Sequence, residues 1–291
     1  MNHGIDPLAA EPPWHQVLVH FHDYAAAKET GTIHIGPEMA RAESEGLIAA
    51  WFFIRKSPSW RLRFQPAHHD IGQATAALIH ERLEKLRSAG HIACWTETIY
   101  EPETYAFGGT AGMHAAHHLF HADSHHILAY LANTGSDTPD ARSDRRRELT
   151  LLLCTNLIRA AGQDWYEQGD VWARVADIRS APHDTSPARL NNRESGLRRL
   201  ITADTSPTSS LMREGGSLAP LSPWFAAFAH AGRTLRALAH GGTLSRGLRA
   251  VLAHHVIFHW NRIGVPLATQ CALASTAKTA VLGREERSPS R

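Results

Sequence analysis

The chain has 291 residues, of which 43% are hydrophobic and 20% are charged, so it holds enough apolar material for a folded core. Its 30 basic and 28 acidic side chains give a formal net charge of +2, which excludes a global field that would collect nucleic acid or anionic membrane. Three scattered cysteines without a CxxC pattern, no signal peptide and no spanning apolar run predict a cytoplasmic protein.

The first third of the chain has the pattern of β-strands. Residues 17–21 alternate in hydropathy, and Trp51–Lys56 is an aromatic and β-branched run bounded by turn residues. The return strand Trp60–Phe64 alternates strictly, which predicts a hairpin whose tryptophan, leucine and phenylalanine face the core. Arg61 and Arg63 then share the other face of that strand.

Helical periodicity dominates the rest of the chain. A helix around Ile79–Leu86 and a strand over Ile92–Tyr100 complete the sheet region. Further helices are predicted over residues 113–131, 148–162, 222–240, 246–263 and 266–282. Residues 133–147 and about 180–221 lack periodicity and are predicted to be long loops, the second a candidate lid.

These elements predict an α+β fold, with an antiparallel sheet in the N-terminal third packed against a mostly helical C-terminal portion. We expect one domain over residues 1–291, mainly sheet in 14–110 and mainly helical in 111–282. No internal repeat is visible in the sequence.

The two arginines of the return strand are candidate peptide-binding groups. Side chains at i and i+2 on one strand face lie about 6 to 7 Å apart, so Arg61 and Arg63 could grip carbonyl or carboxylate groups of an extended peptide. Arg55, across the hairpin, adds a third positive charge nearby. The alternative is a solvated outer face of an antiparallel sheet, which is the commoner fate of such alternation.

A dense polar segment follows the last strand and ends in a double glycine. Here Glu101 or Glu103 could accept a proton and Tyr105 could donate one, beside glycines that let the backbone turn tightly. A plain loop with solvated carboxylates has the same sequence pattern.

Histidines are unusually frequent, with 21 in the chain. Four of them follow one helical stripe, namely His114, His118, His121 and His125. Because there is no HExxH pattern and no evident carboxylate or thiolate ligand from a second element, we predict a polar helix face without metal or cofactor. Asp123 and Ser124 interrupt the same helix, and we expect both to need buried partners.

The penultimate helix carries the richest chemistry. His255, His259 and Arg262 fall at i, i+4 and i+7, beside Trp260 and Asn261. Imidazole can move a proton near neutral pH, guanidinium can stabilise a developing oxyanion, and indole can stack on a planar heterocycle. A satisfied helix surface remains the alternative.

These motifs, in this order, resemble the C-terminal, elimination-type domain of lantibiotic dehydratases. The resemblance is carried by Trp51–Arg55 with Trp60–Phe64 (FFxR and IRLR), Tyr100–Gly109 (YxxE to aromatic-Gly-Gly), Phe120–Ser124 (FxxDS), Glu148–Thr150, Asp164–Trp172 and Phe258–Arg262 (HxNR). It covers about residues 14–282, and each motif is weak alone.

The resemblance implies a stand-alone module, because the glutamylating part of the larger enzymes does not fit into 291 residues. Relatives of this kind either eliminate glutamate from glutamylated Ser or Thr, or build the pyridine core of thiopeptides. Elimination-type members carry an Arg just before the aromatic-Gly-Gly, whereas this chain has Ala106. Loss of that guanidinium penalises an eliminase but not a cyclase, so the sequence favours a pyridine synthase.

The implied reaction is a formal [4+2] cycloaddition between two dehydroalanines of an azole-containing precursor peptide, followed by loss of water and of the leader peptide. The resemblance implies proton-transfer roles for His259, Tyr105 and Glu103. Substrate-binding roles fall to Arg61, Arg63, Arg262, Trp260, Asn261, Glu101 and Asp123.

Two alternatives stay open, namely a stand-alone glutamate eliminase and a non-catalytic module that binds leader peptides. We expect a leader-bearing precursor peptide as partner and no nucleic acid or membrane. Contact with other enzymes of the pathway and a homodimer also stay open.

Overall fold

The structure, a computed structural model, describes residues 12–133, 145–180 and 191–283, without the side chains of residues 191–195. The chain divides into two compact units. The first comprises Met1–Glu101 and Ser124–Ser136, and the second comprises Pro102–Asp123 and Asp137–Arg291. Helix α4, Thr110–Asn133, contributes residues to both. The prediction of one domain over the whole chain stays a prediction.

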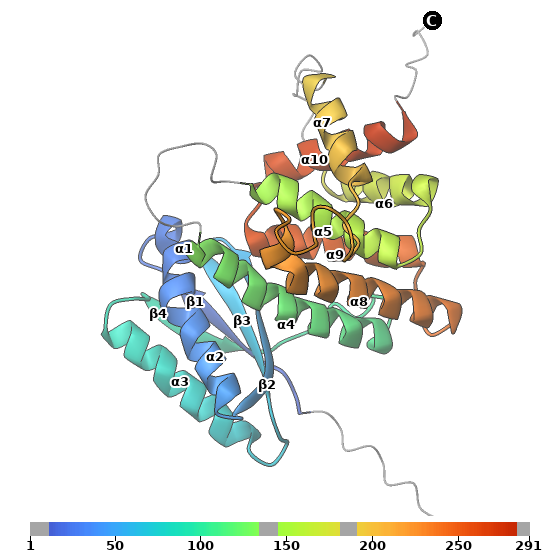
Figure 1. Cartoon of the computed structure of the whole chain (residues 1–291). Coiled ribbons are helices and arrows are strands. Elements are labelled where there is room, and N and C mark those ends of the chain that lie inside the picture. Colours follow the sequence, from blue (N-terminus) through green and yellow to red (C-terminus); the bar gives the residue numbers. More distant parts are fainter. Residues whose placement is uncertain (1–11, 134–144, 181–190, 284–291) are drawn as a thin grey trace, which may run out of the picture. The chain divides into compact units, whose positions relative to one another are not determined.

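The first unit is built on a four-stranded antiparallel sheet with strand order β2-β3-β1-β4 (Figure 1). The strands are β1 (His15–His20), β2 (Ile48–Lys56), β3 (Ser59–Pro66) and β4 (Cys94–Thr98). The predicted sheet and its hairpin are therefore confirmed. Trp60, Leu62 and Phe64 are buried as the alternation required.

The strand register corrects the expected place of Arg55. Arg61 lies opposite Ile54 and Arg55 lies opposite Trp60, and directly opposed residues share a face of the sheet. Arg55 is thus on the Trp60 face, where its guanidinium lies 4.9 Å from the Trp60 ring centroid. It does not add charge to the face that carries Arg61 and Arg63.

The sequence predicts only one of the α-helices at the start of the first unit. Helix α3 (Gly72–Ser88) was expected and packs on β3 and β4, whereas α1 (Ala27–Thr30) and α2 (Gly36–Ser44) fall where strands were expected to dominate. A short π-helix, Gly31–Ile35, joins the latter two. Gly31 lies so close to the Trp60 indole that an added Cβ would sit 2.2 Å from it, so only glycine fits.

The second unit is helical. It contains α5 (Arg146–Ala160), α6 (Trp165–Ile178), α7 (Asn191–Thr202), α8 (Ser222–His240), α9 (Leu248–Ile263) and α10 (Leu267–Leu282). Helix α6 packs against α9 and α10, and α5 packs against α8. Within the described part of the chain, no helix combines the length and hydropathy needed to cross a membrane.

The predicted long loop over residues 180–221 is wrong as stated, because α7 lies inside it and the 3-10 turn Ala219–Leu221 ends it. Residues 181–190 of this candidate lid lie outside the described residues. Most of the other predicted loop, residues 134–144 of 133–147, lies outside them as well.

Candidate functional site

A buried polar network forms where α4, α8 and α9 meet in the second unit. The Asp123 carboxylate accepts hydrogen bonds from Trp224 Nε1 at 2.8 Å, from His259 Nδ1 at 3.0 Å and from Arg262 Nη1 at 2.6 Å. Relative exposure is 0% for Asp123, 2% for His259 and 1% for Arg262. The expectation that Asp123 needs buried partners is confirmed.

The network keeps its carboxylate ionised. Burial alone would raise the pKa of Asp123, but the charges and hydrogen bonds of His259 and Arg262 outweigh it and hold that pKa below its ordinary value. Nδ1 of His259 faces the carboxylate and donates to it, and Nε2 lies on the opposite side of the ring. Nε2 is buried and has no partner among the described residues.

An aromatic cluster surrounds a neutral histidine next to this network. Phe107, Phe120 and Phe258 pack within 5.0 to 5.3 Å of one another, and the Phe107 ring lies 4.9 Å from the His255 ring. Burial, with the nearby Arg262, lowers the pKa of His255 to about 3. Neither ring nitrogen of His255 has a hydrogen-bond partner among the described side chains and backbone.

Trp260 and Asn261 have internal partners. Trp260 is fully buried, with its ring stacked 6.1 Å from that of Trp172. Asn261 Oδ1 accepts from Gln270 Nε2 at 3.0 Å. A substrate cannot reach the Trp260 ring in this conformation, so the expected stacking surface is part of the core.

In the first unit, Arg63 is also buried, at 2% exposure. Its Nε donates to Gln16 Oε1 at 2.7 Å, and its guanidinium lies 4.2 Å from the Tyr100 ring centroid. Arg61 is half-buried and Glu101 is exposed. The alternative of a solvated outer sheet face is therefore wrong for Arg63, which is buried. It stays open for Arg61.

The segment Glu103–Gly109 of the second unit is a tight turn against the start of α9. Gly108 and Gly109 have φ of 83° and 98°, which L side chains rarely adopt. Ser245 N–H donates to Gly108 O at 2.9 Å, so the residues before α9 are bonded to the turn. Tyr105 is 76% exposed.

The Arg246 side chain brings a positive charge to the double-glycine turn, where Ala106 carries none. Arg246 Nη1 donates to Ala106 O at 3.3 Å, and its guanidinium carbon lies 5.4 Å from the Tyr105 ring centroid. The same Nη1 is 3.5 Å from His254 Nδ1. The expectation that the double-glycine turn lacks a guanidinium is therefore corrected, because a residue remote in sequence supplies one.

The histidine stripe on α4 has internal contacts. The His114 and His118 rings lie 4.5 Å apart, edge to face.

In the first unit, Glu43 Oε2 lies 2.9 Å from His125 Nε2, so α2 does supply a carboxylate that the sequence did not reveal. Ser124 Oγ accepts from Phe53 N–H at 3.3 Å, as its expected need for a partner requires. The prediction of no metal stays a prediction.

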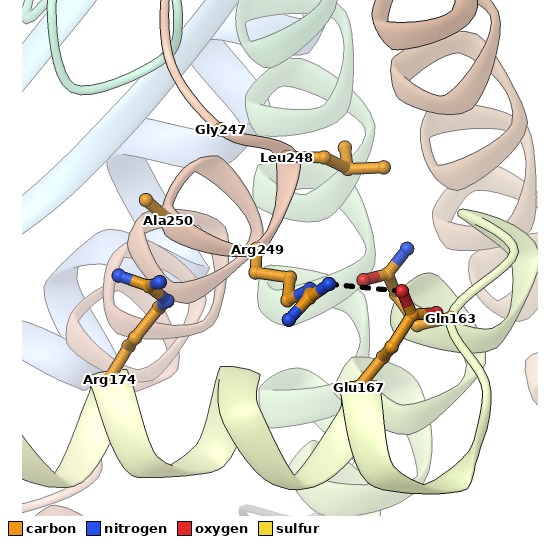
Figure 2. A pocket seen from close by; sticks show the side chains of 7 residues that line it. All are labelled: Gln163, Glu167, Arg174, Gly247, Leu248, Arg249 and Ala250. Carbon is orange, nitrogen blue, oxygen red and sulfur yellow. Dashed lines mark hydrogen bonds and ion pairs between the residues drawn. The ribbon is translucent and has the colours of Figure 1, made fainter.

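Two cavities open within the second unit. One of about 470 Å³ lies between α6 and the start of α9, where Arg249 bonds to Glu167 and Arg174 lies about two turns further along α6 (Figure 2). The other, about 760 Å³, lies between α5, α7 and α10 and has leucines and alanines on its walls. None of the predicted site residues lines either cavity.

Sequence reasoning missed Arg246 and His254. Arg246 acts on a backbone atom 140 positions away, which no local spacing reveals. His254 precedes the i, i+4, i+7 stripe of α9 by one residue, so that spacing does not include it.

Comparisons with known proteins agree with the fold. The sequence profile described as lantibiotic biosynthesis dehydratase C-term matches residues 14–281. Among curated proteins, no sequence matches significantly.

Solved structures that share the fold include MibB, TsrL and TbtD. The tRNA-dependent lantibiotic dehydratase MibB from Microbispora sp. 107891 is 17% identical with a TM-score of 0.63, over 96% of this chain and 29% of that one. TsrL is 15% identical with a TM-score of 0.63, over 92% of this chain and 94% of that one. TbtD, the pyridine synthase from thiomuracin biosynthesis, is 16% identical with a TM-score of 0.60, over 92% of this chain and 97% of that one.

Proposed function

The chain belongs to the family of lantibiotic biosynthesis dehydratase C-terminal domains, and from that premise we propose that it modifies a ribosomally made precursor peptide as a pyridine synthase. The reaction is a formal [4+2] cycloaddition between two dehydroalanines, one of them as the iminol tautomer of its amide. Loss of water and expulsion of the leader as a carboxamide then leave an aromatic ring within a macrocycle.

The observation that carries this proposal is the likeness of fold to a pyridine synthase over 97% of that chain's length. The double-glycine turn offers the exposed phenol of Tyr105 for hydrogen bonding to a peptide, but it does not add to the preference for ring formation, because Arg246 supplies a guanidinium beside Ala106. Much of the rate acceleration would come from holding two ends of one flexible peptide together, since that removes a large entropic barrier.

The roles proposed for the individual side chains differ with their access. Tyr105 is exposed and Glu103 is half-buried, so both remain candidates for proton transfer to and from the peptide. Arg61 remains a candidate for binding peptide carbonyls. His259, Arg262 and Asp123 are buried together, and we propose that they hold α4 and α9 in place and contact substrate only in a more open conformation.

Arg246 favours a second candidate function. A guanidinium beside Ala106 could stabilise the carboxylate of a leaving glutamate, so the missing arginine at position 106 no longer separates ring formation from elimination. The second candidate is therefore a glutamate eliminase acting on glutamylated Ser or Thr.

One incubation distinguishes these functions. The purified, folded protein is given either a leader-bearing peptide that carries azoles and two dehydroalanines or a glutamylated precursor, and products are followed by mass spectrometry. The proposal expects an aromatised macrocycle and a free leader amide from the first peptide. Release of glutamate from the second, with the first unchanged, would establish the eliminase, and leader binding without turnover of either would establish a binding module.

A further inference from the structure

Several accessible polar groups of the second unit gather around Arg246. This side chain, half-buried before α9, contacts the Tyr105 ring, the Ala106 carbonyl oxygen and the His254 ring. We call these residues the Arg246 cluster, consisting of Tyr105, Ala106, Arg246 and His254. Unlike the network around Asp123, it includes a side chain that is 76% exposed.

The proton of the His254 ring can be placed from its contacts. Nδ1 lies 2.9 Å from the carbonyl oxygen of Ala250, one turn earlier on α9. A carbonyl oxygen can only accept, so this shorter contact assigns the proton to Nδ1 and the lone pair to Nε2, and the 3.5 Å approach of Arg246 Nη1 to Nδ1 is then a contact between two donors and no hydrogen bond. Nε2 makes no hydrogen bond to another described residue, and unlike Nε2 of His259 it is not a buried atom.

The surroundings keep this imidazole neutral. Burial lowers the pKa of His254 most, the Ala250 carbonyl raises it, and the cations Arg246 and Arg179 lower it further, for a net decrease. Phe107, the other neighbour, adds an uncharged ring edge to face. At neutral pH the group is therefore a free base next to a fixed positive charge.

We propose that His254 is the group that accepts a proton from the bound peptide, and that Arg246 stabilises the negative charge formed on the peptide oxygen. The inference rests on the proposed function and names its proton acceptor. His254 Nε2 takes the amide N–H proton while the charge on the amide oxygen faces Arg246. The imidazolium then gives that proton to the oxygen, so the amide becomes its iminol with no net change in protons.

The ligand class follows from the same groups. A guanidinium that already donates to one backbone carbonyl, an exposed phenol and a neutral imidazole offer two donors and one acceptor. That set matches an amide or dehydroamino-acid unit of a peptide, which presents one carbonyl oxygen and one N–H.

The test compares His254→Gln with a matched control, His240→Gln, which replaces an exposed histidine on α8 of the same unit. The probe is the azole peptide with two dehydroalanines. His254→Gln should lower kcat/KM by about 100-fold or more, as expected for loss of a general base, while His240→Gln stays within about twofold.

Wild-type turnover should fall with acid only below pH 6.5, because a protonated imidazole cannot accept a proton. His254→Gln turning over within threefold of the wild type would overturn the inference.

A second measurement does not depend on turnover. Diethyl pyrocarbonate at pH 7, mapped by mass spectrometry, should acylate Nε2 of His254 and leave His259 unmodified, and the azole peptide should protect His254. If neither the azole peptide nor a glutamylated peptide is converted, the proposed function fails, yet labelling still decides whether His254 is a reachable, peptide-covered base. An unlabelled His254 in the folded protein, or labelling that the peptide does not reduce, would overturn the inference.

Discussion

Two groups of polar side chains share helix α9 and differ chiefly in burial. In the Asp123 network, a carboxylate accepts hydrogen bonds from an imidazole and a guanidinium at 2.6 to 3.0 Å, and all three groups are at most 2% exposed. In the Arg246 cluster, a guanidinium meets an exposed phenol and a half-buried imidazole whose Nε2 has no bond to a described residue. The residue types alone would fit a catalytic role for either group. Solvent access separates them, because a buried group is suited to a structural role and an accessible group can reach a peptide.

The largest effect should come from breaking the network. Asp123→Ala leaves the Arg262 guanidinium buried without its carboxylate, which should cost about 3 to 5 kcal/mol in the free energy of unfolding. Urea unfolding measures it, with Asp177→Ala on the surface of α6 as control. Wild-type stability of Asp123→Ala would refute a structural role for the network.

The sign of the pH effect follows from the lowered pKa of Asp123. Because the folded pKa lies below the unfolded one, the stabilisation is complete above the ordinary pKa of 3.8 and is lost as pH falls through the folded value. The part of the acid limb that Asp123 contributes should therefore be missing in Asp123→Ala, whose stability should fall less steeply with acid than that of the wild type.

Removing the guanidinium of the cluster should act on the reaction instead. Arg246→Gln should lower kcat/KM by about 10²- to 10³-fold, the loss typical of one oxyanion-stabilising donor, and should change unfolding free energy by no more than about 0.5 kcal/mol. Arg246→Lys should recover part of the activity. An unfolding loss comparable to that of Asp123→Ala would place Arg246 with the structural groups.

Replacing His255 should have a smaller effect on the free energy of unfolding than replacing Asp123, and in the stabilising direction. Its ring nitrogens are buried without partners among the described residues, so His255→Leu should leave stability at pH 7 unchanged or raise it by up to about 3 kcal/mol. The folded pKa is lowered to about 3, so in the wild type the unfolded state gains protons first and stability falls from pH 6.5 towards 3. Thermal unfolding against pH should show this slope reduced in His255→Leu, and an unchanged slope would contradict the burial argument.

The smallest effect is expected at the exposed edge of the cluster. Tyr105→Phe keeps the ring that Arg246 contacts and removes only the hydroxyl, so kcat/KM should fall by about tenfold, the worth of one hydrogen bond. Steady-state kinetics with the azole peptide measure it. A loss as large as that of Arg246→Gln would make the phenol an equal partner in proton transfer.

Periodicity and chemistry predicted much of this structure. Strict alternation in Trp60–Phe64 predicted β3, and the polar interruption at Asp123 and Ser124 correctly indicated buried partners. Burial of Arg63 and Trp260 was not predictable, because the pattern along one element does not show what packs on its polar face. Arg246 replaces a charge missing at position 106 through a contact between distant segments, which only tertiary structure reveals.

The most direct test of the account measures turnover and Tm together for His254→Gln and His259→Gln. It predicts that His254→Gln keeps the wild-type Tm and loses about 100-fold or more of its turnover, whereas His259→Gln lowers Tm because the Asp123 carboxylate loses a partner. Wild-type turnover in His254→Gln, together with a fully stable but inactive His259→Gln, would contradict it.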